Sequence, residues 1–251
     1  MPDLGTAQLI TADWVLLVLI CVWLPIQEIL RLPTTRHAIR ADTTDLRLAF
    51  YRDAISMLWL TTGCVALVWF VEDRDGRALG LSFDGDVAGF IGLAVAVLIA
   101  AVFLLRFVAV TRIERARDAY AAATVAAADQ LRFMPRSRRE YRSFVVLAVT
   151  AGITEEVVFR GYLIWALSTL LPVPAAAAAS LLVFVVMHLY QGKDQLLPIT
   201  AMGCAFTLLY LASGSIYPVV LAHVAIDVLG AATWRAASEP DHVRSPISAS
   251  A

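Results

Sequence analysis

Two adjacent glutamates and an arginine lie in the middle of an apolar stretch, "TAGITEEVVFRGYLIW", which runs from Thr150 to Trp165. Glu156 and Arg160 are four residues apart, so on a helix they face the same way, with the acid N-terminal to the base, the better order for an ion pair. Glu155 is rotated by about 100° from Glu156 and has no basic residue at a favourable spacing. We therefore expect Glu155 to face a cavity and to serve as a general base for water.

Two histidines follow in later apolar stretches. "FVVMH" ends with His188, and Phe184 shares its helical face. In "HVAID", His223 and Asp227 are four residues apart and share a face of another helix. Together with Glu155, these residues predict a site of one carboxylate, two imidazoles and an acidic partner, contributed by three helices.

Two chemistries fit this set of side chains. In the first, Glu155, His188 and His223 bind zinc or another divalent metal and leave an open position where bound water becomes acidic. In the second, Glu155 and His188 activate water, while His223 and Asp227 stabilise the oxyanion that forms when a peptide carbonyl is attacked. The HExxH pattern of soluble zinc proteases is absent. The residues alone leave both chemistries open.

The composition places these groups in a membrane protein. Of the 251 residues, 60% are hydrophobic and only 16% are charged, which is unlike a soluble domain. A charge at membrane depth costs about 2.5–3.5 kcal/mol on insertion scales, so a charge found there is a candidate for function. No apolar run shows the strict alternation of a β-barrel. We predict an all-α, polytopic transmembrane helical bundle.

About seven apolar runs approach the length that spans a bilayer. The last four would form a C-terminal catalytic core. We expect helices over Trp14–Leu30, Ala54–Val71, Val87–Leu105, Phe144–Leu171, Ala175–Tyr190, Leu196–Ala212 and Ile216–Trp234.

The chain divides into four parts on composition. Residues 1–110 supply three transmembrane helices with few ionisable groups inside them. Residues 111–142 form a basic, largely helical connection on the cytoplasmic side. Residues 143–235 form the catalytic core, and the Ser-, Pro- and Ala-rich residues 236–251 are expected to be a disordered tail.

Arginines are concentrated in two of the connections. Five lie between the first and second expected helices and nine lie between Arg106 and Arg142, whereas the second connection holds five acids and two arginines. The positive-inside rule then places the N-terminus outside and the C-terminus in the cytoplasm. We expect an integral, multi-pass protein, in the plasma membrane if the host is a bacterium. The net charge of −1 gives no indication of a nucleic-acid partner.

The three motifs, in this order, resemble those of the CAAX protease and bacteriocin-processing family of intramembrane endopeptidases, also called the Abi family. "EEVVFR" matches its Glu-Glu-xxx-Arg motif, "FVVMH" its Phe-xxx-His motif and "HVAID" its His-xxx-Asn/Asp motif, and the similarity covers roughly residues 135–235. The resemblance implies a polytopic α-helical protease. Eukaryotic members of the family remove the last three residues from prenylated CAAX proteins.

The resemblance also implies roles for residues in all three motifs, namely Glu155, Glu156, Arg160, His188, His223 and Asp227. Glu155 and His188 would activate water, His223 and Asp227 would hold the oxyanion, and the remaining two would support them. Asp227 stands where the eukaryotic CAAX enzymes have Asn. Because an ionised Asp would repel an oxyanion, we expect Asp227 to orient His223 or to bind a metal instead.

Three functions are consistent with these residues. The first is an intramembrane endopeptidase, metal-assisted or not, that acts on a membrane-associated or lipidated protein or peptide, prenylated CAAX proteins included. The second is a proton- or ion-coupled transporter that uses the same buried ionisable groups. The third is a non-catalytic immunity or scaffold protein. Each has the lipid bilayer as a partner.

The expected depths of the site residues disagree. At about 1.5 Å per residue, Glu155 and His223 come out in the outer half of the membrane, whereas His188 lies near the cytoplasmic end of its helix. A shared site therefore requires tilted or displaced helices.

Overall fold

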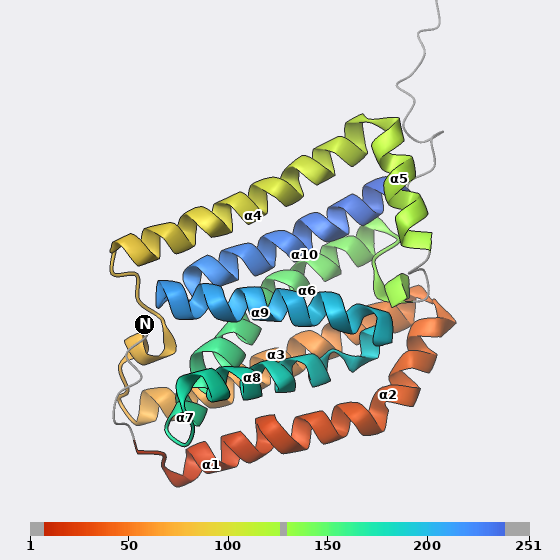
Figure 1. The fold of residues 1–251 in the computed structure, drawn as a ribbon. Coiled ribbons are helices and arrows are strands. Elements are labelled where there is room, and N and C mark those ends of the chain that lie inside the picture. The colour runs from red at the N-terminus through yellow and green to blue at the C-terminus, as the bar shows by residue number, and fades with distance from the viewer. Residues whose placement is uncertain (1–7, 126–129, 239–251) are drawn as a thin grey trace, which may run out of the picture.

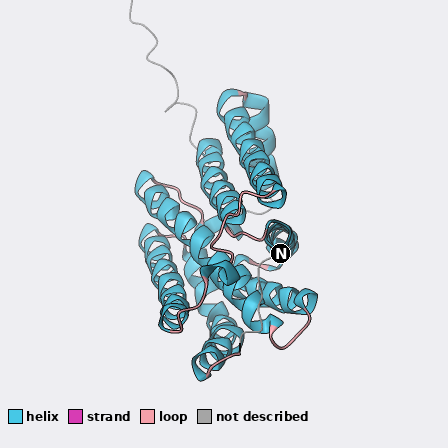
Figure 2. Cartoon of the chain, turned by 90° about the vertical axis from the view of Figure 1, so that its left-hand side faces the viewer, coloured by secondary structure: helices cyan, strands magenta, loops and turns pink. Residues whose placement is uncertain are grey.

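Long helices make up most of the computed structural model (Figure 1). The structure describes residues 8–125 and 130–238, and within these ranges it contains helices and connections but no strand (Figure 2). The predicted all-α polytopic bundle is therefore confirmed. Five helices in the described residues are long and apolar enough to cross a membrane: Thr11–Ala41, Thr44–Val71, Val87–Arg112, Lys193–Ser213 and Tyr217–Ser238.

The two other predicted spans are also helical. One is a continuous run of three segments: α6 (Arg138–Glu155), the π-helical η4 (Glu156–Leu163) and α7 (Ile164–Ser168). The other is α8 (Val173–Met187), a shorter apolar helix of 15 residues. Each of the seven expected helices thus has a counterpart, although the bounds differ.

The first helix is longer than predicted at both ends. It consists of α1 (Thr11–Val18), the π-helical η1 (Leu19–Trp23) and α2 (Leu24–Ala41). The predicted end at Leu30 placed Arg31, Arg36 and Arg40 in a connection. In the structure these three arginines lie on the helix. The helix ends only at Asp42, whose φ of 57° lies in the left-handed region. Between Thr11 and Ala41, no residue has a positive φ that would end the helix earlier.

The remaining elements follow in chain order: α3 (Thr44–Val71), η2 (Gly76–Leu79), α4 (Val87–Arg112), α5 (Glu114–Val125), η3 (Gln130–Phe133), η5 (Leu189–Gln191), η6 (Lys193–Gln195), α9 (Leu196–Ser213) and α10 (Tyr217–Ser238). Two helices begin well before their apolar runs, α3 by ten residues and α6 by six. The side chain of Thr43 accepts a hydrogen bond from Leu46 N–H before α3, and Ser137 forms a capping box with Glu140 before α6. Polar caps, and not apolar residues, fix where these helices start.

The C-terminal helices pack against the N-terminal ones. α10 packs against α4 on one side and α6 on the other, α3 packs against α6, and α2 packs against α8 and η5. In Figure 1, α1 and α2 run along one edge of the bundle and α4 along the opposite edge. α5 covers one end of the bundle, hereafter the α5 end, and the helix N-terminus at Thr11 lies at the other.

The outer surface of α1–α4 is strongly apolar. Large side chains point outward along these helices, among them Val15, Leu30, Phe70, Leu98 and Leu105. An exposed apolar surface of this extent marks a membrane or protein contact. Together with the five long apolar helices, it identifies an integral membrane protein.

The basic connection and the tail differ from expectation in their bounds. α4 continues to Arg112, two residues beyond the boundary predicted at 110, and the described part of residues 111–142 is largely helical. α10 continues to Ser238, so residues 236–238 are helical and the predicted disorder is wrong for them. Residues 239–251, the rest of the predicted tail, lie outside the described residues.

Candidate active site

Glu156 and Arg160 form a buried ion pair inside η4, as their spacing predicts. Arg160 Nη1 donates to Glu156 Oε1 at 3.0 Å, and both side chains are almost fully buried. Arg160 also donates to the carbonyl of Gly203 at 3.4 Å and lies over the rings of Phe184 and Phe206. A buried charge needs such compensation because its desolvation is costly.

Glu156 also fixes the ring of His223. Nδ1–H of His223 donates to the same Oε1 of Glu156 at 2.6 Å. Nε2 of His223 lies 3.6 Å from Oδ2 of Asp227, which is longer than a good hydrogen bond. The orienting role expected for Asp227 therefore falls to Glu156. Because Nδ1 carries the hydrogen, Nε2 is the nitrogen that faces the cavity.

His188 is oriented in a similar way by the backbone of its own helix. Its Nδ1–H donates to the carbonyl of Phe184 at 2.7 Å, and the two rings pack with centroids 4.3 Å apart. The Phe-xxx-His spacing thus supplies a hydrogen-bond acceptor one helical turn before the histidine. As in His223, Nε2 of His188 is left to face the cavity.

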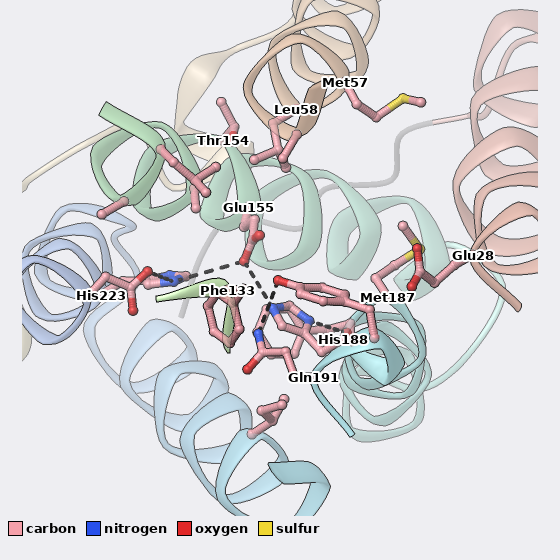
Figure 3. A pocket seen from close by; sticks show the side chains of 18 of the residues that line it. Glu28, Met57, Leu58, Phe133, Thr154, Glu155, Met187, His188, Gln191 and His223 are labelled. Carbon is pink, nitrogen blue, oxygen red and sulfur yellow. Dashed lines mark hydrogen bonds and ion pairs between the residues drawn. The ribbon is translucent and has the colours of Figure 1, made fainter. Parts of the chain in front are cut away.

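Glu155 lies between the two imidazoles (Figure 3). Its Oε2 atom is 4.0 Å from Nε2 of His188 and 4.0 Å from Nε2 of His223. This oxygen is buried and has no hydrogen-bond partner among the described residues. A separation of 4.0 Å is too long for a direct hydrogen bond but can be bridged by one shared water. The three motifs predicted to converge do so.

The mismatch in depth expected between Glu155 and His188, the residue that follows α8, is not observed, since Oε2 of Glu155 and Nε2 of His188 lie 4.0 Å apart. This helix ends at Met187, and the chain covers the remaining distance toward the α5 end through η5 and η6 (Figure 1). His188 is therefore about 22 Å from the start of α8, within the bundle. The sequence analysis had extended this helix to Tyr190, three residues beyond its observed end.

The close approach of α6 and α10 depends on Gly152, which the sequence analysis did not single out. A Cβ atom at Gly152 would lie 2.5 Å from Cγ2 of Val224 and 3.1 Å from its backbone nitrogen. Gly152 is about one turn before Glu155, and Val224 follows His223. Gly152 could have been found in the sequence as a small residue one turn before an intramembrane carboxylate. Small residues at such positions indicate close packing between membrane helices.

Four of the six predicted site residues, Glu155, His188, His223 and Asp227, line a cavity of about 600 Å³, whereas Glu156 and Arg160 lie behind it as a buried ion pair. Its walls are mostly apolar and include side chains of the N-terminal helices, such as Leu24 of α2 and Met57 and Leu58 of α3. Polar lining includes Glu28 and Arg31 of α2. Sequence analysis missed this wall because apolar residues of a membrane helix carry no local signal of the cavity they face.

A metal was the first of the two chemistries expected here. The carboxylate and imidazoles are suitable donor types for zinc, but Zn–N and Zn–O bonds of about 2.0–2.2 Å place ligand atoms roughly 3.3 Å apart. The observed separations of 4.0 Å are wider. Within the described residues, no group of three or more His, Cys, Asp or Glu side chains is arranged to hold a metal ion. As arranged, the three side chains suit a shared water better than a shared metal.

Comparison with family models supports the resemblance found in the motifs. The model of the Rce1-like family, described as type II CAAX prenyl endopeptidase Rce1-like, matches residues 138–229. This range starts at α6, ends within α10 and contains every predicted site residue. Comparisons with curated proteins and with solved structures give no match.

The long apolar helices define the class of this molecule as an integral membrane protein, and its C-terminal part is similar to the Rce1-like family. The match over residues 138–229 confirms the resemblance for the C-terminal part of the chain. The N-terminal helices lie outside the matched range but supply one wall of the cavity.

Proposed function

We propose that this protein is an intramembrane endopeptidase in which Glu155 and His188 activate a water molecule. One observation carries the proposal: the buried, unpartnered Oε2 of Glu155 lies 4.0 Å from Nε2 of His188 inside the cavity. A water between these atoms can donate one hydrogen to each, which leaves its oxygen lone pair free to attack a carbonyl carbon.

The reaction follows from these positions. The water oxygen forms a bond to the carbonyl carbon, and Glu155 takes the proton that the water loses. The carbonyl oxygen becomes an oxyanion in the tetrahedral intermediate. When the C–N bond breaks, the proton held by Glu155 passes to the leaving nitrogen, so the products are a carboxylic acid and an amine.

His223 is the candidate to stabilise the oxyanion. When protonated, its Nε2–H is free to donate, because Nδ1–H is already held by Glu156. The carboxylates of Glu156 and Asp227 compensate the charge of the imidazolium. In this scheme Asp227 acts on His223 and not on the oxyanion, which agrees with the repulsion expected between two negative groups.

The cavity supports a membrane-associated or lipidated substrate. Its lining is predominantly apolar, and α2 and α3, which supply one wall, also expose apolar surface toward the lipid. An apolar anchor such as a prenyl group and the adjoining peptide could occupy such a space together. A prenylated C-terminal peptide is therefore the first substrate to test.

The test uses the full-length protein in liposomes with two quenched peptides, one S-farnesylated at a C-terminal CAAX sequence and one non-lipidated transmembrane peptide. Wild type should cleave one of them, and Glu155→Gln should lower the rate by about 10³-fold, within the range for loss of a general base. No cleavage by wild type, with proton or ion flux lost in Glu155→Gln, would instead favour a transporter.

We further propose that the N-terminus lies outside and the C-terminus in the cytoplasm. In Figure 1, the end of α2 and the start of α6 lie at the α5 end of the bundle. Arg36 and Arg40 are near that end of α2, and Arg138 and Arg139 begin α6, as the positive-inside rule requires of a cytoplasmic end. Single cysteines introduced at Asp84 and Glu114 test this orientation with an impermeant thiol reagent on intact cells. Labelling of the cysteine at Asp84 alone supports the proposal, and labelling at Glu114 alone reverses it.

A further inference from the structure

The segment that follows His188 places two further polar side chains in the cavity. Tyr190 and Gln191, both in η5, line it together with Glu155, His188 and His223. Arg36 of α2 donates to the carbonyl of Leu189 at 2.8 Å and so ties this segment to the N-terminal wall. Neither Tyr190 nor Gln191 belongs to the three motifs identified in the sequence.

Aromatic packing holds the ring of Tyr190 in place. It lies near the rings of Phe50, from α3, and Phe133, from η3, with centroid separations of 5.3 and 6.2 Å. It is also nearly parallel to the ring of His188, at 6.3 Å and an interplanar angle of 25°. Three separate elements therefore fix this phenol beside the histidine that faces Glu155.

The hydroxyl of Tyr190 has a hydrogen to offer. Gln191 Nε2 donates to its oxygen at 3.2 Å, and the Gln191 amide is turned toward His188 (Figure 3). Since an amide nitrogen only donates, the phenol oxygen is the acceptor and its own hydrogen stays available. Among residues 8–125 and 130–238, no protein acceptor takes that hydrogen. Carboxylates of Glu155 and Asp227 lie within electrostatic range of the ring.

The proposed reaction needs such a neutral donor. An oxyanion is normally held by two or more hydrogen bonds, and in this chain Asp227 replaces the Asn that could donate one. An ionised carboxylate cannot donate, whereas a phenol keeps its hydrogen at neutral pH. We propose that Tyr190 is a catalytic residue whose hydroxyl donates to the oxyanion alongside His223, and that Gln191 is a positioning residue that aims this hydroxyl.

This inference rests on the proposed protease function and is tested on the same liposomes and peptides. Tyr190→Phe removes only the hydroxyl. We expect kcat to fall by about 100-fold, as for loss of one oxyanion donor, with KM and melting temperature unchanged. Tyr210→Phe is the matched control, because Tyr210 is buried in α9, its hydroxyl has no partner among the described residues, and it does not line the cavity.

A second measurement separates catalysis from packing. A phosphinic peptide presents a tetrahedral anionic centre, so its affinity should fall in Tyr190→Phe by the same factor as kcat, while the affinity for uncleaved peptide, measured in a Glu155→Gln background, stays constant. Gln191→Leu should lower kcat less than Tyr190→Phe does.

Failure of the role proposed for Tyr190 can be distinguished from failure of the protease proposal. Wild-type cleavage that is lost in Glu155→Gln but retained in Tyr190→Phe overturns the role of Tyr190 alone. A fall in kcat with unchanged affinity for the phosphinic peptide also overturns it. If wild type cleaves neither peptide, both the protease proposal and the role of Tyr190 fail.

Discussion

Glu156 accepts a hydrogen bond from His223 at 2.6 Å, although 67 residues separate the two in the sequence. The same carboxylate oxygen accepts from Arg160 at 3.0 Å. One buried atom thus joins η4 to α10 and balances a cation inside the bundle. Glu155, the next residue toward the N-terminus, makes no hydrogen bond through its Oε2 atom within the described part of the chain. The adjacent glutamates therefore differ in role: Glu156 stabilises the packing of η4 against α10, and Glu155 faces the cavity.

The same substitution at these two positions should give opposite results. Glu156→Gln leaves Arg160 buried without its counter-charge, so we expect a loss of about 3–5 kcal/mol of stability and a lower melting temperature in detergent. Glu155→Gln should keep the wild-type melting temperature and lose cleavage. A Glu155→Gln protein that melts as early as Glu156→Gln would contradict this division of roles.

Gly152 should control the distance between Glu155 and His223. In Gly152→Ala, the added Cβ meets both the side chain and the backbone of Val224, so α6 and α10 must move apart. A displacement of about 1 Å at the site would lower kcat by roughly 100-fold. Cleavage rates in liposomes measure this effect.

Two variants control for the Gly152 prediction. Gly63→Ala, in α3, should leave the rate unchanged because no atom of the residues that the structure describes lies within 4 Å of its new Cβ. Val224→Ala combined with Gly152→Ala should recover only part of the activity, since the backbone contact at 3.1 Å remains. A Gly152→Ala protein with the wild-type rate would show that the helix spacing is not limiting.

Glu140 should make stability depend on pH. Burial alone would raise the pKa of its carboxyl, but hydrogen bonds from Arg47 and from the backbone N–H groups of Arg136 and Ser137 outweigh burial and lower the pKa to about 2. The folded state thus favours the ionised form. Its stabilisation is complete above the ordinary value of 4.5 and is lost as the pH falls toward 2.

Melting temperatures of the purified protein between pH 7 and pH 2 test this linkage. Glu140→Gln should melt lower than wild type at pH 7, and the difference should shrink as the pH falls below 4.5. Glu114→Gln, at an exposed position on α5, should follow the wild-type curve. A difference between Glu140→Gln and wild type that is constant with pH would show that the ionisation of Glu140 does not stabilise the fold.

Cleavage should not require a bound divalent metal. The separations of 4.0 Å between Glu155 and the two histidines suit a shared water, so treatment with 1,10-phenanthroline should change the rate by less than about twofold. Elemental analysis of the same samples should find less than one zinc per chain. Loss of activity on chelation, restored by zinc and accompanied by zinc loss in His188→Ala, would support the metal-assisted chemistry instead.

The sequence was informative wherever the relevant interaction is local. Composition and apolar runs predicted the seven helices, and the spacing of Glu156 and Arg160 predicted their ion pair, because residues four apart on one helix meet whatever surrounds them. Helix ends were less predictable: α3 begins ten residues before its apolar run, since a cap at Thr43 starts it. The extra turns of α2 carry arginines that a connection was expected to hold.

By itself, then, the sequence determined the class of fold, the three motifs and the residues able to do chemistry. Only the tertiary structure decided that Glu156 rather than Asp227 holds His223, that His188 lies level with Glu155, and that Tyr190 and the walls of α2 and α3 complete the cavity. The physical reason is that these relationships depend on where helices cross. A crossing is set by packing contacts such as that of Gly152 with Val224, between residues far apart in the chain.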